Sequence, residues 1–548
     1  MKVNSTKFSS ISSLRELLRE RWRYGATVFA GKMIGLCAVL MVIITLPGLI
    51  GSAAHAASTV AKVDTSALQK SMIAATVNTE NAINTVWTLV AAFLVFAMQA
   101  GFTMLEAGFA RKRESVNVLM ECIFDTCLCG LLFYACGYAF MFSYGNGFIG
   151  YHWFFLQNTT GAPFAGAPLN PTDAYLTTGV PIIAHWIFQY AFADTCSTVV
   201  SGAMIGRTGF RGDILYSIGI TGFIYPIIGH WAWGPDGWLA VMGSAGNFWV
   251  SLGQGFRDFA GSTVVHTIGG IASLAGAVVL GPRIGRVFAR DGGGMPPGNN
   301  LIVGAVGGFI LWFGWYGFNP GSTLSAMDSI GIGRVATNTT LAACGGGVTA
   351  MFAALWWGPT KGKFDVALTT NGFLAGLVAI TCPCYWVSPL GASLLGGVAG
   401  FVVFGGVQLL EYLRIDDPLG AVPVHGFAGI WGTLSLGLFA SGQFGATGPT
   451  GPDNSAPVKG VFYGGDFSVL KAQAFGTFTI AISVFIVTWV MMKLIMLLPH
   501  PWKLRVEEHG ETGPGGLDMF DHGAIAYDLE DGDVSLSGLF EKSAPVSA

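Results

Sequence analysis

The chain has 548 residues, of which 52% are hydrophobic and only 11% are charged, with a formal net charge of −3. Soluble domains carry about 25% charged residues, so this composition excludes an ordinary soluble protein and predicts a membrane protein with several spans. No basic stripe typical of nucleic-acid-binding proteins is present in the sequence. We therefore expect membrane lipid around the protein and no nucleic-acid partner.

The amino terminus has the layout of a secretory signal. Residues 1–32 are polar and basic, an apolar run follows over residues 34–46, and Ala54-His55-Ala56 has the small-x-small form of a cleavage site. We therefore expect a signal peptide over residues 1–56, with an uncleaved membrane anchor as the alternative. Residues 57–80 would then form a short extracytoplasmic segment before the first span.

Eleven apolar segments after residue 80 are long enough to cross about 30 Å of hydrocarbon. They predict an all-α polytopic membrane domain over residues 81–498, followed by a cytoplasmic tail over residues 499–548. The expected spans are roughly 82–109, 116–142, 178–205, 214–232, 259–281, 300–318, 335–357, 367–386, 389–410, 424–441 and 472–498.

Lysine and arginine are shared unevenly between the two sets of alternate loops. Cytoplasmic loops are enriched in these residues, so the richer set predicts the inner side and leaves the mature amino terminus outside. A cleaved signal peptide requires the same start. The richer set holds Arg111, Lys112, Arg113, Arg207, Arg211, Arg283, Arg286, Arg290, Lys361, Lys363 and Arg414, and the poorer set holds Arg257, Arg334, Lys459 and Lys471.

One nine-residue pattern occurs twice, each time at the start of an apolar segment. Residues 258–266 and residues 417–425 both read Asp-x-x-Gly-x-x-x-Val-His. Given the loop charges, the first copy runs inward and the second runs outward. This predicts an inverted repeat of five spans plus five, with one extra span at the end. Each histidine follows its aspartate by about 12 Å of helix, so both should approach the middle of the membrane.

The histidines of the pattern, His266 and His425, predict a polar centre in an apolar pathway. Histidine is rare in apolar spans, because burial of an ionisable group is unfavourable there. Two neutral imidazoles can bond to each other and hold a small polar molecule or relay a proton. The alternative is two separate histidines, each bonded to a backbone carbonyl. Neither a full set of metal ligands nor a catalytic nucleophile accompanies them, so we expect no metal, no cofactor and no enzyme activity.

Several longer stretches carry a resemblance to a known family. They are residues 258–266, 312–322, 371–380 and 425–432, with shorter similarity over residues 106–111 and 116–120. In these stretches the chain resembles the ammonium transporter family (Amt/Mep, related to Rhesus proteins), in particular its Amt-type members. The resemblance implies an ammonium transporter of the bacterial inner membrane, assembled as a homotrimer with one pore per subunit. It also implies a possible PII-type regulator at the cytoplasmic face.

The resemblance also implies roles for individual residues. In the implied mechanism, ammonium is recruited outside, loses a proton and crosses as ammonia, with or without that proton. Aromatic faces attract a cation by about 0.5–2 kcal/mol, which suits the recruitment step. The implied residues are Phe192, Trp233 and Ser322 in an outer ammonium site; Phe188, Phe192 and Phe318 in a gate; His266 and His425 in the pore; Asp258 and Asp417 as structural or electrostatic residues; and Trp315 and Asp194 as additional candidates.

Three positions depart from the pattern of this family. Asp194 is a carboxylate inside a span, where it could contact the cation or face a partner helix, and we expect the second. Gly206 precedes Arg207 where the family usually has an acidic residue, and Phe520 stands where some members carry a phosphorylatable threonine. An ammonium sensor of the same fold is the alternative function, and Asp194 is the feature that favours it.

Overall fold

The computed structural model describes residues 65–157, 179–242, 252, 255–359, 362–444 and 457–527. By its contacts the chain divides into two units, Met1–Ala75 and Thr76–Ala548. The expected signal peptide lies outside the described residues, as do the first residues of the expected extracytoplasmic segment. The second unit holds the helices that position the site.

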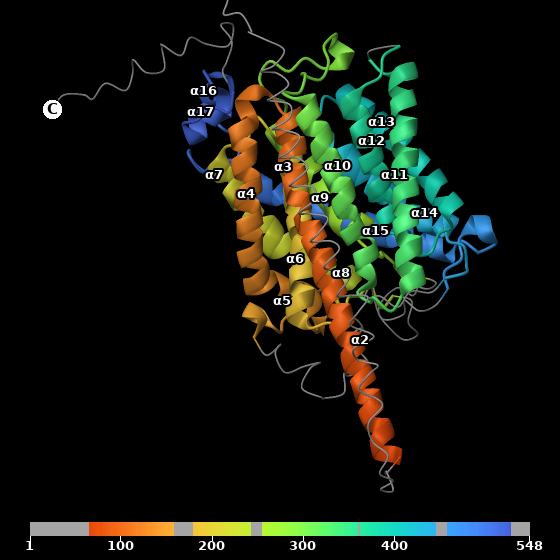
Figure 1. Cartoon of the computed structure of the whole chain (residues 1–548). Helices are drawn as coiled ribbons and strands as arrows, with labels where there is room; N and C mark the ends of the chain where they lie inside the picture. The colour runs from red at the N-terminus through yellow and green to blue at the C-terminus, as the bar shows by residue number, and fades with distance from the viewer. Residues whose placement is uncertain are drawn as a thin grey trace, which may run out of the picture. The chain divides into compact units, whose positions relative to one another are not determined.

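Helices make up most of the described structure, which has almost no strand (Figure 1). In the first part of the chain they are α2 (Thr65–Phe96), α3 (Met98–Phe109), α4 (Ser115–Leu132), α5 (Tyr138–Phe142), α6 (Ile182–Gly202), α7 (Phe210–Gly219), α8 (Tyr225–Trp233) and α9 (Ile268–Leu280). In the second part they are α10 (Leu301–Phe318), α11 (Ser329–Trp357), α12 (Val366–Thr381), α13 (Pro389–Leu413), α14 (Ala428–Phe439), α15 (Ser468–Met496), α16 (Glu508–Thr512) and α17 (Gly516–His522). Strands β1 (Gly145–Asn146) and β2 (Ile149–Gly150) pair antiparallel.

Irregular helical turns extend several of these helices. Short 3₁₀ turns are η2 (Lys112–Glu114), η4 (Phe154–Leu156), η7 (Ala289–Asp291), η8 (Pro320–Thr323) and η10 (Val461–Tyr463). Wider π turns are η3 (Phe133–Gly137), η5 (Ile220–Ile224), η6 (Ser262–Thr267) and η9 (Val422–Phe427). Two of them, η6 and η9, contain the pattern histidines and lead directly into α9 and α14. Turns of this kind are frequent at functional sites.

The described residues contain nine helical segments long and apolar enough to cross a membrane, and α12 is a shorter apolar helix. Counting α12 and the 21-residue α6, every expected span coincides with a helix. The helical membrane fold is therefore confirmed, whereas the number of eleven crossings stays a prediction. The first helix begins earlier than expected, at Thr65, because residues 65–81 contain no glycine or proline to end it.

The two repeats meet where segment η6–α9 crosses segment η9–α14. A Cβ atom added to Gly270 would lie within the backbone of Gly426, and one added to Gly429 would contact the carbonyl oxygen of Ser262. Gly270 and Gly429 each follow a pattern histidine by four residues. Glycine at both positions lets the two segments approach closely beside the histidines, as the predicted inverted repeat requires.

The carboxyl-terminal tail packs against the membrane domain, where α16 and α17 lie beside α4 and α7 (Figure 1). The backbone N–H of Gly209 donates to the carbonyl of Leu504 at 3.0 Å. A carboxylate of the tail, Asp518, accepts from the backbone N–H of Asn117 at 2.8 Å. The described part of the tail is therefore attached to the loop after α6 and to the start of α4.

Candidate functional site

Each aspartate of the repeated pattern caps the helical segment that carries its histidine. Asp258 accepts four backbone N–H bonds at 2.8–3.0 Å, and Asp417 accepts three at 2.9–3.1 Å. The donors are Gly261, Ser262, Thr263 and Val264 for Asp258, and Gly420, Ala421 and Val422 for Asp417. The pattern glycines have φ angles of +115° at Gly261 and +74° at Gly420, which favour glycine. The shared pattern therefore produces a similar cap twice, with one more backbone bond at Asp258 than at Asp417.

Burial acts on both caps, which precede the membrane-spanning helices. It raises the pKa of Asp258 and of Asp417 to about 6, although the backbone N–H donors favour the charged carboxylate. Within the described residues neither carboxylate makes an ion pair with a basic side chain. Their function in the fold is therefore to fix the backbone that leads to each histidine.

The two pattern histidines meet, as the sequence predicts. The Nδ1 atoms of His266 and His425 lie 3.2 Å apart, within hydrogen-bonding distance. Both side chains are buried, and the Nε2 atom of His266 has no hydrogen-bond partner among the described residues. The alternative of two separate histidines bonded to backbone carbonyls is therefore wrong. The pair leaves an outward nitrogen free to bind a small polar molecule.

Aromatic rings form a continuous column on the side of His266. Phe192 stacks on Phe318 with ring centroids 3.9 Å apart, and Phe318 stacks on His266 at 5.4 Å. Trp315 also stacks on His266, with ring centroids 5.1 Å apart, and its Nε1 donates to the hydroxyl of Thr381. These rings surround the imidazole with apolar faces, which penalise a charged species more than a neutral one.

A small cavity lies at the far end of this column. It is lined by Phe142, His185, Phe188, Gln189, Phe192, Trp233, Phe259 and Ser322. The sequence-predicted outer site is therefore brought together, since Phe192, Trp233 and Ser322 all contribute. Phe188 also lies here, with its ring 4.6 Å from that of Phe192. Trp233 connects the cavity to the first cap, because its Nε1 donates to the carbonyl of Asp258 at 2.8 Å.

Two polar residues of the cavity were missed by the sequence analysis, His185 and Gln189. The Nε2 atom of Gln189 lies 3.3 Å from the Nε2 atom of His185, and the Nδ1 of that histidine lies 2.8 Å from the hydroxyl of Tyr138. Residues 185, 188, 189 and 192 share one helical face, so spacing from the predicted phenylalanines would have found both.

Asp194 does not line the cavity. It lies on α6 two residues after Phe192, which turns it to the opposite side of the helix, and it is fully buried against α4. The expectation that Asp194 faces a partner helix is therefore supported. Its contact with a cation in the cavity is ruled out by the direction of its side chain.

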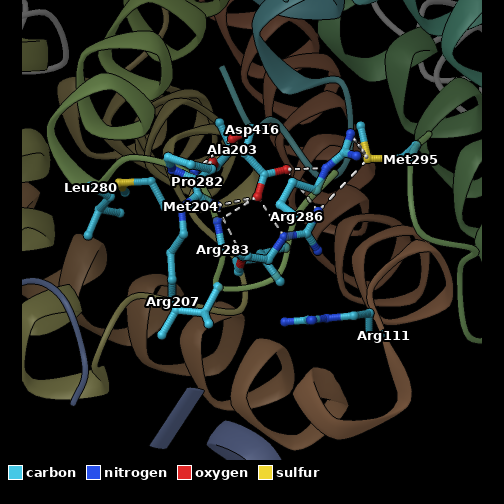
Figure 2. Close-up of polar contacts among 12 residues, drawn as sticks. Arg111, Ala203, Met204, Arg207, Leu280, Pro282, Arg283, Arg286, Met295 and Asp416 are labelled. Carbon is cyan, nitrogen blue, oxygen red and sulfur yellow. Dashed lines mark hydrogen bonds and ion pairs between the residues drawn. The ribbon is translucent and has the colours of Figure 1, made fainter. Parts of the chain in front are cut away.

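The end of the molecule near Asp417 carries an ion-pair cluster that the sequence analysis missed (Figure 2). Asp416, the residue before that cap, accepts hydrogen bonds from Arg283 at 2.8 and 2.9 Å and from Arg286 at 3.3 Å. Arg207 donates to its backbone carbonyl at 2.6 Å. Burial alone would raise the pKa of Asp416, but Arg283 and Arg207 hold it well below its ordinary value. The cluster ties together the loops after α6, α9 and α13.

Gly206 provides space for a carboxylate from another helix. It has a φ of +84°, and a Cβ atom there would overlap the carboxylate of Glu114, which also pairs with Arg111. An acidic group thus stands beside position 206, supplied by Glu114 and not by the residue before Arg207. No group of described residues has the geometry to hold a metal ion, and the described cysteines are free.

The crossing half-helices, the buried histidine pair and the ring column define a polytopic helical membrane protein in which the two copies of the repeated pattern meet. The sequence profile of the Ammonium Transporter Family matches residues 86–527. The chain therefore belongs to the ammonium transporter family.

Relatives from several kingdoms share this similarity. The chain is 42% identical to the ammonium transporter Amt2 of Archaeoglobus fulgidus, covering 82% of this chain and 89% of that protein. It is 34% identical to ammonium transporter 1 member 3 of Solanum lycopersicum, covering 82% and 94%. Among solved structures, a protein described as a sensor Amt protein matches with a TM-score of 0.67 at 32% identity, covering 81% and 99%. Mep2 of Candida albicans matches with a TM-score of 0.67 at 27% identity, covering 79% and 88%.

Proposed function

We propose that the protein transports ammonium by recruiting the ion in the cavity, deprotonating it and conducting ammonia along the histidine pair. The observation that carries this proposal is the ring column, which runs from the cavity through Phe192 and Phe318 to His266. A cavity of polar and aromatic groups suits a cation, whereas the stacked rings below it suit a neutral molecule. The change between the two environments favours loss of the proton.

In the proposed outer site, Phe192 and Trp233 offer ring faces to the cation and Ser322 offers an acceptor. The hydroxyl of Ser322 donates to the carbonyl of Phe318 at 2.7 Å, which leaves its lone pairs for an ammonium hydrogen. Potassium donates no hydrogen bonds, so this site discriminates by hydrogen bonding as well as by charge. Phe188, Phe192 and Phe318 would act as the gate, since their packed rings close the path to water.

In the proposed pore, His266 and His425 accept or donate one hydrogen bond each to ammonia while they bond to each other. The experiment is ammonium-dependent current and ammonia flux in liposomes, for wild type beside His266→Ala and His425→Ala. We expect both variants to lose most of the flux, and His152→Ala, an exposed histidine outside the column, to keep it. Unchanged flux in both pore variants would contradict the proposal. Preserved ammonia flux without current in wild type would instead exclude the electrogenic version.

An ammonium sensor is the second candidate function, because the sensor Amt protein shares both fold and sequence with this chain. Growth of an uptake-deficient bacterial strain on low ammonium separates the two. Rescue by the wild-type gene favours transport, and expression at the membrane without rescue favours a sensor. An Asp194→Asn variant belongs in the same assay, because Asp194 is the sequence feature that distinguishes this chain.

We also infer a homotrimer in a bacterial inner membrane, with the amino terminus outside and the tail in the cytoplasm, where a PII-type protein could bind. Family membership supports the trimer, and the exposed apolar side chains of α13, such as Leu390, Leu394 and Phe401, suit lipid or a second subunit. Native mass spectrometry tests the trimer. Accessibility of cysteines introduced in the tail, measured in inside-out and right-side-out vesicles, tests the orientation.

A further inference from the structure

A second polar region lies inside the membrane domain, on the face of α6 that points away from the cavity. Asp194, Ser197, Thr198 and Ser201 lie along this face and are all buried. They meet polar residues from three other helices: Gln99 and Glu106 on α3, Asn117, Glu121 and Asp125 on α4, and Asp213, Tyr216 and Ser217 on α7. We call these twelve residues the acidic seam. Five of its members are carboxyl groups, which is unusual in apolar surroundings.

Hydrogen bonds join the seam from helix to helix. The hydroxyl of Ser197 donates to Asp125 at 3.3 Å, and that of Thr198 donates to the amide oxygen of Gln99 at 3.1 Å. The amide nitrogen of Asn117 donates to Glu121 at 2.7 Å. The chain of contacts thus runs from the middle of α6 to the start of α4.

The seam holds more acceptors than the described residues satisfy. Both carboxyl oxygens of Asp194 and of Asp213 are buried without a hydrogen bond of good geometry, and so is one oxygen each of Glu121 and Asp125; the nearest hydroxyls are those of Thr126 beside Asp194 and Tyr216 beside Asp213. Two fully buried hydroxyls point into the same space: that of Tyr216 beside Asp213, and that of Ser217 beside Asp125. Neither hydroxyl makes a hydrogen bond of good geometry with a described residue, although each interacts with the carboxyl group beside it.

Positive charge is missing from the seam. The electrostatic neighbours of Glu106, Glu121, Asp194 and Asp213 are other carboxyl groups, and no described basic side chain pairs with any of them. Several unpaired carboxylates buried together are strongly unfavourable. Something must neutralise them, and the described residues offer no group with the geometry for a metal ion. The small neutralising species that remains is the proton.

We propose that the acidic seam is a proton-binding site, in which protons with their associated water are shared among Glu106, Glu121, Asp125, Asp194 and Asp213. The bound protons let these carboxyl groups donate as well as accept, which satisfies the unpartnered oxygens and hydroxyls. The seam meets the tail at Asn117, whose backbone N–H donates to Asp518 and whose side-chain oxygen lies 3.0 Å from the Nε2 atom of His522. Of these residues only His522 is partly exposed, so we expect protons to exchange with water through this end.

Because the acidic seam lies behind α6, its protonation affects the proposed gate. The same helix presents Phe188 and Phe192 on one face and Asp194 on the other. Loss of the protons would make the carboxylates repel across α4, α6 and α7, which would displace α6 and its rings. Titratable groups outside the seam that face it are Cys122 and Cys129 on α4, Tyr190 on α6, and Asp518, Asp521 and His522 of the tail.

Infrared spectroscopy of the lipid-reconstituted protein tests the proposal directly, because protonated carboxyl groups have their own carbonyl-stretch band. We expect this band in wild type at neutral pH, shifted by exchange into heavy water. Asp194→Asn and Asp213→Asn should each reduce the intensity of this band by about one fifth, because each removes one of the five carboxyl groups of the seam. The control is Asp365→Asn, which removes a carboxylate that caps α12 outside the seam and should leave the band unchanged.

Thermal unfolding of the same variants gives a second, independent measurement. If the carboxyl groups bind protons, Asp194→Asn replaces one neutral group by another of similar shape, so its midpoint should stay near that of wild type below about pH 4, where the unfolded carboxyl is also protonated, and exceed it as the pH rises. Absence of the band in wild type, or a band that neither substitution changes, would overturn the proposal. So would a metal ion that copurifies in stoichiometric amount and is lost in Asp213→Asn. None of these measurements depends on whether the pore conducts.

Discussion

The two copies of the repeated pattern form similar caps and face different surroundings. Asp258 binds the backbone of η6 and, through its carbonyl, the indole of Trp233 beside the cavity. Asp417 binds the backbone of η9, but its neighbour Asp416 anchors Arg283 and Arg286. The difference shows that the repeat determines local geometry, whereas the flanking residues determine what each half is attached to. One half is joined to the cavity lined by Phe192 and Trp233, and the other to the loops that hold the tail.

The largest effect should come from removing the charge of a cap. In Asp258→Asn the amide oxygen can accept two of the four backbone N–H groups, while its NH₂ group faces the other two. In Asp417→Asn a single backbone N–H loses its acceptor. Each buried donor left unsatisfied costs about 1–3 kcal/mol, so we expect losses of about 2–6 kcal/mol for Asp258→Asn and about 1–3 kcal/mol for Asp417→Asn. Thermal unfolding of the purified protein measures both.

The matched control for these caps is Asp365→Asn, because Asp365 accepts one backbone N–H bond at the partly exposed start of α12. An exposed cap is worth about 1 kcal/mol, so this variant should be the mildest of the three. Equal destabilisation by Asp258→Asn and Asp417→Asn would mean that the number of backbone bonds does not distinguish the two halves.

A smaller effect is expected at the crossing of the two half-helices. An alanine at Gly270 would place its Cβ within the backbone of Gly426, which cannot move without displacing His425. Overpacking of this kind costs about 1–3 kcal/mol. We expect Gly270→Ala to lose ammonium flux as well as stability, because the histidine pair separates. Gly405→Ala, on α13 with open space around it, should keep both; equal flux in the two variants would contradict a required close crossing.

Much of this arrangement could be predicted from the sequence, because it is encoded in short patterns. The Asp-x-x-Gly-x-x-x-Val-His repeat, with loop charge and the inverted order, predicts that His266 and His425 meet, whereas the capping role of its aspartates is added by the structure. Asp416 could not be found in this way, since its partner Arg283 lies 133 residues away and no pattern links them.

The acidic seam could not be predicted from spacing for a similar reason. Asp194 stood out because it is a carboxylate in a span, yet its surroundings depend on how α4, α6 and α7 pack. Asp125 and Asp213 lie on other helices, and a linear sequence does not show that their buried faces meet. Pairing between distant helices is therefore the information that the three-dimensional structure adds.

The smallest expected effect is on the pH dependence of stability, to which the adjacent residues Asp416 and Asp417 should contribute differently. The folded-state pKa of Asp417 is raised to about 6, above its ordinary value of 3.8, so its contribution to stability is full below about 3.8 and is lost as the pH rises through 6. The pKa of Asp416 is lowered, so its contribution is present above 3.8 and is lost only as the pH falls below that value. Of these two residues, only Asp417 should contribute to the change in stability between about pH 5 and 8, by about 1–2 kcal/mol.

Thermal unfolding at these two pH values should therefore show a flatter pH dependence in Asp417→Asn than in wild type. Asp416→Asn should be destabilised by a similar amount at both pH values, with the wild-type slope retained, because its arginine partners stay charged throughout. The slope in Asp417→Asn should shrink without vanishing, since burial raises the pKa of Asp258 to about 6 as well. A slope that disappears in Asp416→Asn and persists in Asp417→Asn would reverse the assignment. The cap, and not the arginine cluster, would then be the pH-insensitive element of this half.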